Sequence, residues 1–548
     1  MTTAPNITLP KQVFSSSRHQ LISNCLLSFS LFLFVLIPLT QSAIADIKVV
    51  KAEGVSGRGL SPIQIAKRVQ RSLEKVKPAS ISVNGGASGV IISLDGYVLT
   101  ASHVALSPRI KGKQILIFLE DGRKLKAELI GVDRSSDIAL LKINEESDPL
   151  PYVELSDKVP DDASCCFIYA HPGGYKKTRP AQLRLGRIRG CTQKDGQTLF
   201  MMSDVSVQPG DSGGPLFDVD GRLIGLCISA GPVGVNRFTS IDNFHKALGA
   251  MKEGKIWGDI KDSQLDTKPR DIDDALKKRV IAEFQKRIKD GYPPATDLVF
   301  RKAADGTRAN EFGDITRNMG MDVPMMMDNG SISYGLDDPV LTAQLGKLPE
   351  GTVRQIPVLS KNKLVTFGIP VTNQHLLVKL SEIKKFPELH LPKSKGKLFS
   401  LTQCGTDPEW DLALLKLPDR INFKPVEWPE KVIEIKAGTG VMSSDTRGRL
   451  SWAVAADIRR PVNKPGRKGP MLDPTIISSF RAPYPSVISH GLPLYAKHAG
   501  TPVYTLEGEL IGLHMGRISR TLGLIVDIHD IRKSVRKMLE APKGKTYP

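Results

Sequence analysis

Three residues whose types suit acyl-transfer chemistry occur in the first half of this chain of 548 residues. His103 lies in LTASHV, Asp137 in SSDIALLKI and Ser212 in QPGDSGGP, with separations of 34 and 75 residues. A serine hydroxyl is a poor nucleophile at neutral pH, so it needs a base within hydrogen-bond reach and a third group that orients the base. His103 is suited to take the serine proton, and Asp137 to fix the imidazole tautomer. Together the three residues predict a catalytic triad.

Each of these residues, taken alone, has an ordinary structural explanation. A single His beside a strand is more often structural, an Asp before an apolar run often only caps a strand, and a Gly-Ser-rich turn can be only a turn. Their combination favours catalysis. The glycines around Ser212 allow a tight turn, so the sequence also predicts an oxyanion hole made by the backbone amides of Gly210 and Ser212.

The chain contains a second, altered copy of these motifs. KHAGTPVYTLEGELIGL at 497–513 aligns with GDSGGPLFDVDGRLIGL at 210–226, and this alignment puts Ala499 over Ser212. IPVTNQHL and TDPEWDLALLKL align with YVLTASHV and VDRSSDIALLKI, which predicts that His375 and Asp411 match His103 and Asp137. Matching blocks in the same order indicate an internal duplication. Because Ala499 has no hydroxyl and Lys497 and His498 replace Gly210 and Asp211, the second site is expected to be chemically inactive.

Short strands dominate both copies, and turn signals such as Asp121-Gly122 separate them. This pattern predicts an all-β fold of barrels or sandwiches. Helical periodicity is limited to 62–76, behind Ser61 as N-cap, and to about 271–290 in the connecting segment. The expected organisation is a signal peptide at 1–45, an N-terminal helical segment at 46–77, a first domain at 78–248, a partly helical linker at 249–349 and a second domain at 350–540.

The first copy resembles the trypsin-like serine proteases, and most of all their bacterial HtrA (Deg) branch. The resemblance rests on VKPASISV, SGVIISLDGYVLTASHV, the DIALLKI block and PGDSGGPL, across about residues 75–248. It implies tandem trypsin-like double β-barrel domains. The first pair of barrels is expected at about 78–147 and 152–245, with the active site between them. The second copy, with His375, Asp411 and Ala499 as its degenerate site, is then a pseudoprotease domain.

Three departures from the family's pattern limit what the resemblance implies. No PDZ-like module is apparent after the first domain, because the repeat occupies that place. No Ile-Val-Gly-Gly-type activation sequence precedes the barrels, so Asp211 needs a partner other than a new amino terminus. Arg184, Arg187 and Arg189 are the candidates. The floor of the substrate pocket is expected at Ser206 and Val207, which predicts cleavage after small or medium apolar residues.

Residues 1–45 contain Lys11 and Arg18 and no acidic residue, then CLLSFSLFLFVLIPLT, and finally Ala43-Ile44-Ala45. This layout predicts a secretory signal and export to the periplasm or the exterior, with an uncleaved membrane anchor as the less favoured reading. Five cysteines remain after the signal. One bridge between Cys166 and Cys191 is a reading that stays open, but buried free thiols are favoured.

The net charge is +19, or +17 without residues 1–45, and the cations are scattered along the chain. A solubilising surface is the favoured explanation, although such a charge also suits an anionic envelope surface. No nucleic-acid-binding signature is present. The methionine cluster MGMDVPMMMDNG is better explained by packing or a loop than by metal binding, so neither a metal nor another cofactor is expected.

The sequence thus predicts an exported serine endopeptidase that hydrolyses protein or peptide substrates through an acyl-enzyme. A peptide-binding, chaperone-like or envelope-associated protein without catalysis is the alternative. The motifs leave open whether the chain forms an oligomer. They also leave open whether the second domain binds peptide, clamps the first domain, mediates assembly or is an inert structural partner.

Overall fold

The computed structural model describes most of the chain from residue 47 to residue 541. The described ranges are 47–51, 60–107, 114–144, 149–161, 163–177, 179–194, 197–229, 236–259, 300–302, 308–310, 345, 352–353, 355–392, 398–444, 450–462, 484–494, 498–517 and 521–541. The predicted signal peptide, the predicted linker helix at about 271–290, the methionine cluster and Lys497 lie outside the described residues.

Residues 80–143 form a ring of six strands, which is closed because β6 pairs with both β5 and β7. The Asp121-Gly122 turn joins β5 to β6 as a hairpin, with Gly122 at φ +93°. Along β6, buried and exposed side chains alternate at first, as expected for a strand with one face toward a core. The strands are β2 (Ser80–Val83), β3 (Ala87–Ile91), β4 (Tyr97–Thr100), β5 (Ile115–Phe118), β6 (Lys124–Asp133) and β7 (Ile138–Ile143).

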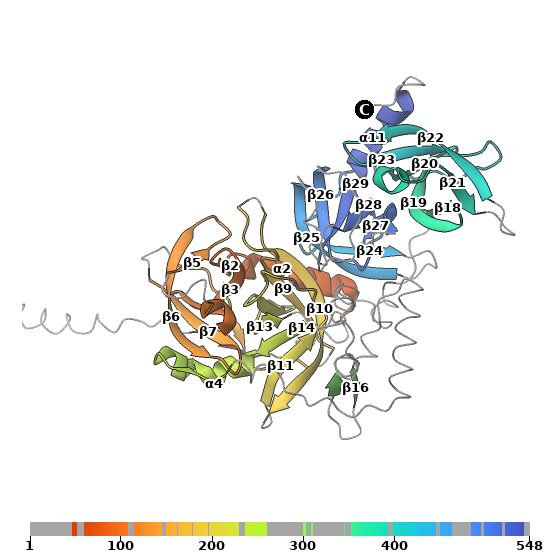
Figure 1. The fold of residues 1–548 in the computed structure, drawn as a ribbon. Coiled ribbons are helices and arrows are strands. Elements are labelled where there is room, and N and C mark those ends of the chain that lie inside the picture. Colours follow the sequence, from red (N-terminus) through yellow and green to blue (C-terminus); the bar gives the residue numbers. More distant parts are fainter. Residues whose placement is uncertain are drawn as a thin grey trace, which may run out of the picture. The chain divides into compact units, whose positions relative to one another are not determined.

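A second six-stranded ring follows at residues 165–240 and closes through the pairing of β13 with β14. Its core contains Ile168, Leu216 and Phe238, all fully buried. Figure 1 shows both rings in orange to green. The strands are β9 (Cys165–Ala170), β10 (Gln182–Lys194), β11 (Gln197–Ser203), β12 (Pro215–Asp218), β13 (Leu223–Ser229) and β14 (Asn236–Ser240).

The second half of the chain repeats this plan with two closed six-stranded barrels. The structure therefore confirms the prediction of tandem double β-barrel domains. The third barrel comprises β18 (Ile356–Ser360), β19 (Lys363–Thr372), β20 (His375–Lys379), β21 (Leu389–Pro392), β22 (Leu398–Asp407) and β23 (Leu412–Lys416). The fourth comprises β24 (Gly440–Ser444), β25 (Leu450–Val462), β26 (Tyr484–His490), β27 (Thr501–Thr505), β28 (Leu510–Arg517) and β29 (Gly523–Asp527).

Helices are few among the described residues, and the three longest begin after a side chain that caps them, namely Ser61, Ser240 and Asp527. The Ser61 side chain accepts a hydrogen bond from Gln64 N, and the Gln64 side chain accepts from Ser61 N, which forms a capping box. This arrangement confirms the predicted helix at 62–76. The helices of the described residues are α2 (Pro62–Val76), α3 (Ser102–Ala105), α4 (Ile241–Lys252), α10 (Leu380–Ile383) and α11 (Ile528–Glu540). Within the described part of the chain, no helix is long and apolar enough to cross a membrane.

In the described part of the chain, five further short strands lie outside the rings. β1 pairs in parallel with β8, and β15 in parallel with β6, while β16 and β17 pair with one another. Their bounds are β1 (Val49–Val50), β8 (Leu155–Ser156), β15 (Ile256–Trp257), β16 (Phe300–Lys302) and β17 (Arg308–Asn310).

Candidate active site

His103 and Asp137 form a close pair in the first barrel. Asp137 lies in the turn between β6 and β7 with φ +57°, and its Oδ2 is 2.7 Å from His103 Nδ1. Its Oδ1 accepts hydrogen bonds from His103 N at 3.0 Å and Ser102 Oγ at 2.6 Å. Because an ionised carboxylate only accepts hydrogen bonds, Nδ1 carries the proton and Nε2 keeps a free lone pair. Asp137 is buried, whereas the His103 side chain is 34% exposed.

The turn that carries Ser212 lies against the end of β4, immediately before His103. Gly213 follows the serine at φ +77°, and a Cβ added to it would lie 2.2 Å from Thr100 Oγ1 and 2.7 Å from Ala101 N. Only a residue without a side chain fits at such a distance. Gly213 N donates to Cys227 O at 2.8 Å, which anchors the turn to the second barrel. Elements of both barrels therefore bring the serine and the histidine to one region.

Ser88 joins the two barrels beneath this turn, and sequence reasoning did not identify it. Its backbone N donates to Ser212 O at 3.0 Å, and its hydroxyl donates to Gly210 O at 2.8 Å. The same hydroxyl accepts from His171 N at 3.0 Å. A serine within a strand carries no sequence signal for such a role. The contacts become visible only when the two barrels are placed together.

Gly210 has a backbone conformation that favours glycine. Its φ is +104°, and an added Cβ would lie 2.5 Å from His171 O and 2.6 Å from Gly174 N. Among the described residues, no group accepts a hydrogen bond from the backbone N–H of Gly210 or of Ser212. Two donors thus remain available on the turn beside the serine. An oxyanion hole requires donors of this kind.

His171 is buried next to this turn. Burial, together with the positive charges of the nearby Arg179 and Arg184, lowers the pKa of its imidazole from 6.5 to about 4. Its ring contacts that of Tyr175, with centroids 5.9 Å apart. The imidazole is therefore neutral at physiological pH and adds no positive charge behind the turn.

Asp211, the residue before the serine, pairs with Arg184. Arg184 Nη1 lies 2.5 Å from Asp211 Oδ2, Nη2 lies 2.8 Å from Asp211 Oδ1, and both side chains are 1% exposed. Arg189 instead pairs with Asp204. Of the three arginines that the sequence offered for Asp211, the structure therefore selects Arg184.

Ser206 and Val207, the expected floor of the substrate pocket, are both buried. Ser206 O accepts a hydrogen bond from Arg184 Nη1 at 3.2 Å. The nearest acidic residue in sequence, Asp204, is fully buried and bound to Arg189, so its charge is already neutralised. Residues 204–207 therefore provide no unpaired carboxylate at the expected floor of the pocket.

In the second copy, Ala499 occupies the position of Ser212. Phe367 N donates to Ala499 O at 2.9 Å, as Ser88 N does to Ser212 O, and Gly500 N donates to His514 O at 2.8 Å, as Gly213 N does to Cys227 O. Ala499 is fully buried. The backbone of the nucleophile turn persists there without its hydroxyl.

His375 does not occupy the position of His103, so the predicted match is wrong. In β4, Thr100 pairs with Ala139, whereas in β20 the residue that pairs with the equivalent Ala413 is Val378. Counting three residues onward from Thr100 and Val378 leads to His103 and to Ser381. His375 instead lies opposite Lys416 at the start of β20 and bonds through Nδ1 to Thr372 Oγ1 at 2.8 Å.

Asp411 has become the acceptor in a buried polar cluster. It keeps the unusual backbone of Asp137, with φ +55°, and its Oδ1 accepts from Ser381 N at 2.8 Å. Its Oδ2 accepts from Ser381 Oγ at 2.7 Å and from Tyr484 Oη at 3.0 Å. Burial raises the pKa of Tyr484 well above its usual value, and the neighbouring Asp411 raises it further. The second site thus lacks both the base and the nucleophile, and its carboxylate serves the fold.

The cysteines of the described residues are free thiols, and those at 165, 166 and 227 are buried. Burial raises the pKa of the Cys166 thiol well above its usual value, and its Sγ lies 3.4 Å from Ser203 Oγ. The favoured reading of the sequence, buried free thiols, therefore holds for these three. A bridge between Cys166 and Cys191 is not formed.

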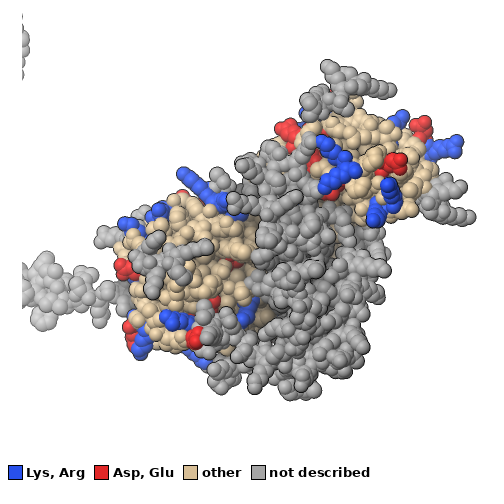
Figure 2. Space-filling model, viewed as in Figure 1, with Lys and Arg blue, Asp and Glu red and all other residues tan. Residues whose placement is uncertain are grey.

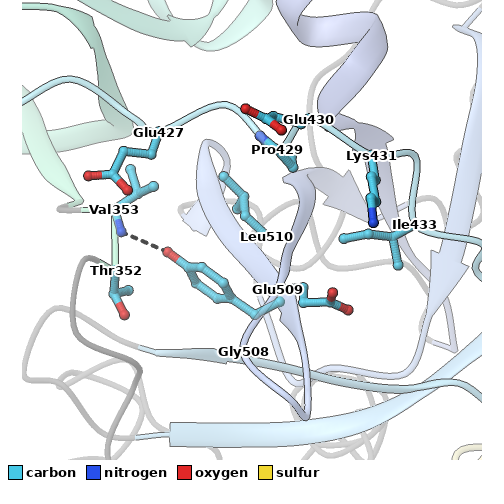
Figure 3. A pocket seen from close by; sticks show the side chains of 11 residues that line it. Thr352, Val353, Glu427, Pro429, Glu430, Lys431, Ile433, Gly508, Glu509 and Leu510 are labelled. Carbon is cyan, nitrogen blue, oxygen red and sulfur yellow. Dashed lines mark hydrogen bonds between the residues drawn. The ribbon is translucent and has the colours of Figure 1, made fainter.

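A cavity of about 400 Å³ lies in the second half of the chain (Figure 3). Carboxylates of Glu427, Glu430 and Glu509 surround it, and Tyr504 Oη accepts a hydrogen bond from Val353 N at 2.9 Å. None of the residues that line it belongs to the site at His103 or to the degenerate site at Asp411. Within the described residues, no group of three or more His, Cys, Asp or Glu side chains is arranged to hold a metal ion.

Residues 87–226 match the family model of the trypsin-like peptidase domain. The first half of this chain therefore contains a trypsin-like peptidase domain. That domain is similar to DegP-like proteins of the HtrA/Deg branch of the serine proteases.

Three relatives of this chain are each named a probable periplasmic serine endoprotease, DegP-like. The protein from Pseudomonas fulva is 38% identical over 297 residues, which cover 52% of this chain and 55% of the relative. That from Hahella chejuensis is 32% identical over 284 residues, covering 48% and 57%. That from Halomonas elongata is 38% identical over 142 residues, covering 25% and 28%. The chain thus spans between about a quarter and somewhat over half of the length of these relatives.

Two solved structures are similar in part. The serine endoprotease from Yersinia pestis is 24% identical, with a TM-score of 0.29, over 34% of this chain and 66% of that protein. The HtrA-type protease AlgW with a tripeptide is 26% identical, with a TM-score of 0.30, over 34% and 64%.

Proposed function

We propose that this protein is an exported serine endopeptidase whose first double barrel hydrolyses peptide bonds of protein substrates. The observation that carries the proposal is the hydrogen bond between His103 Nδ1 and Asp137 Oδ2, beside the Ser212 turn. Relatives named as periplasmic serine endoproteases support both the reaction and the compartment.

In the proposed reaction, His103 Nε2 accepts the proton of Ser212 Oγ as that oxygen attacks the substrate carbonyl carbon. Asp137 stabilises the imidazolium that forms and keeps Nδ1 protonated. The amides of Gly210 and Ser212 donate to the carbonyl oxygen as it becomes negative. His103 then returns the proton to the leaving amine, which leaves an acyl group on Ser212. Water attacks this ester by the same route and restores the hydroxyl.

The substrate preference follows from the pocket floor. Ser206 and Val207 present a small hydroxyl and an apolar side chain, without a carboxylate that could pair with Lys or Arg. We therefore propose cleavage after small or medium apolar residues. A peptide-library profile dominated by Arg or Lys at P1 contradicts this preference.

A fluorophosphonate probe distinguishes this proposal from the peptide-binding alternative. The probe reacts with a serine only when a base activates the hydroxyl. Purified full-length protein should carry one adduct on Ser212 by peptide mass spectrometry, and His103→Ala should lose it. Labelling that is absent in the wild type, or unchanged in His103→Ala, contradicts the catalytic proposal.

The described residues on the face drawn in Figure 2 do not favour the envelope-binding alternative. On the face drawn in Figure 2, Lys and Arg side chains are interspersed with Asp and Glu side chains rather than gathered into one patch. Charges mixed in this way produce weaker local fields than a single-sign surface. Scattered cations on that face are consistent with a solubilising role.

A further inference from the structure

Arg184 connects the pocket floor to the residue that precedes the nucleophile. It projects from β10 and is 1% exposed. One guanidinium nitrogen, Nη1, donates both to Ser206 O at 3.2 Å and to Asp211 Oδ2 at 2.5 Å. The other, Nη2, donates to Asp211 Oδ1 at 2.8 Å. Arg184 thus holds both ends of the segment 206–211.

Asp211 is itself part of the framework of the turn. Its Oδ2 accepts from Gln208 N at 2.8 Å, its N donates to Gln208 O at 3.1 Å, and its O accepts from Gly214 N at 2.7 Å. Both carboxylate oxygens are therefore occupied by groups of the mature barrel. This arrangement gives Asp211 a cationic partner without requiring a new amino terminus.

The second copy provides an internal comparison, because strand register identifies the residue equivalent to Arg184. Phe217 pairs with Phe167 in the first copy, and Tyr504 pairs with Met442 in the second. Phe167 also pairs with Leu185 on the next strand, β10, and Met442 also pairs with Trp452 on the next strand, β25. One residue earlier in each strand stand Arg184 and Ser451.

Both members of the ion pair are thus replaced in the copy that has lost the serine. Ser451 stands for Arg184, and His498 stands for Asp211, where Ala499 stands for Ser212. The fourth barrel nevertheless closes with six strands. The pair is therefore dispensable for forming such a barrel, and it occurs together with the nucleophile.

We infer that Arg184 is a positioning residue for Ser212, and this inference rests on the proposed function. By binding Asp211 and Ser206 O, it keeps the turn from 206 to 212 in the arrangement that points the amides of Gly210 and Ser212 at the oxyanion. The full chain is then active without proteolytic processing at a new amino terminus.

The test separates positioning from stability by removing one charge or both. Arg184→Met leaves Asp211 buried without a cation, so its melting temperature should fall. Arg184→Met with Asp211→Asn removes both charges, and its melting temperature should return toward that of the wild type, because neutral replacement of a whole buried pair is often tolerated. The matched control is Arg222→Met with Asp218→Asn, a second buried pair of the same barrel away from the serine.

The kinetic readout is kcat against KM on a peptide substrate. The double variant at 184 and 211 should lose about 10²-fold in kcat, the usual effect of losing one oxyanion donor, with a smaller change in KM. The control pair should keep the wild-type kcat. A wild-type kcat in the double variant at 184 and 211 overturns the inference and leaves the proposed function intact.

Amide hydrogen exchange gives a second readout that does not depend on activity. The amides of Asp211 and Gly214 are hydrogen-bonded within the turn, and the amide of Gly213 is hydrogen-bonded to Cys227 O of β13. They should exchange faster in the double variant than in both the wild type and the control pair. Unchanged exchange overturns the positioning role. If the wild type hydrolyses nothing, the proposed function fails and the exchange rates still decide the role of Arg184.

Discussion

Ser381 binds Asp411 through the same two contacts by which His103 binds Asp137. Ser381 N donates to Asp411 Oδ1 at 2.8 Å and its hydroxyl to Oδ2 at 2.7 Å. In the first copy, the corresponding distances from His103 N and Nδ1 to the Asp137 oxygens are 3.0 and 2.7 Å. The duplicated fold has thus kept its carboxylate in place and replaced the base with a short hydroxyl.

This relationship predicts which residue of the second copy matters for stability. Ser381→Ala should lower the free energy of unfolding by about 1–3 kcal/mol, because it removes a donor from a buried carboxylate. His375→Ala should have a smaller effect, since that ring is half-buried and makes its hydrogen bond to Thr372. Urea denaturation of the full chain measures both. A larger effect for His375→Ala would contradict the assignment of Ser381 to the position of His103. Neither substitution should alter the rate of hydrolysis.

Replacement of Asp137 tests the orientation of the base. Asp137→Asn should reduce kcat by roughly 10⁴-fold, as in other triads, because an amide does not hold Nδ1 in its protonated tautomer. The control is Asp133→Asn, which alters a neighbouring buried carboxylate that binds Ser136 Oγ at 2.7 Å. Steady-state kinetics on a peptide substrate gives the comparison. An equal loss in both variants would mean that the effect is structural.

Gly210 provides a test of the oxyanion turn. Gly210→Ala forces a side chain against His171 O at a φ that L residues rarely adopt, so the turn must move. We expect a loss of about 10²–10³-fold in kcat. Gly249→Ala in α4 is the control, since its added methyl meets nothing within 4 Å and a helix interior favours alanine. A Gly210→Ala variant with normal kcat would place the oxyanion elsewhere.

The buried imidazole of His171 predicts a dependence of stability on pH. Its pKa in the folded protein is about 4, below its usual value of 6.5, so the unfolded chain binds the extra proton. The full stability is present above pH 6.5 and is lost as the pH falls toward 4, by on the order of 3 kcal/mol. His171→Asn should lose less stability over the same range. Urea midpoints from pH 7 to pH 4 measure the difference, and parallel curves would exclude this contribution.

The sequence predicted the fold class well because its signals were local. Alternating strands, the Asp121-Gly122 turn and the Ser61 cap each act over a few residues, and the structure contains all of them. The alignment of Ala499 with Ser212 agrees with the matching backbone hydrogen bonds of the two turns, because the long motif around Ala499 fixes the register. The sequence could narrow the partner of Asp211 only to one of three arginines, because the choice among them requires knowing which side of β10 faces Asp211.

The match of His375 to His103 was wrong because the sequence alignment paired two histidines, whereas the strand register matches His103 with Ser381. The pairing of β20 with β23 fixes which residue meets Asp411, and that pairing selects Ser381. Ser88 was missed for a related reason. Its contacts join two barrels that are distant in sequence, and no local pattern reports such a contact.

Hydrolysis of an unfolded protein substrate by the full chain, with Ser212→Ala beside it, tests the central claim most directly. The wild type should release new peptide amino termini, and the variant should release none above the uncatalysed rate. Equal turnover by the two proteins would contradict the assignment of Ser212 as the nucleophile.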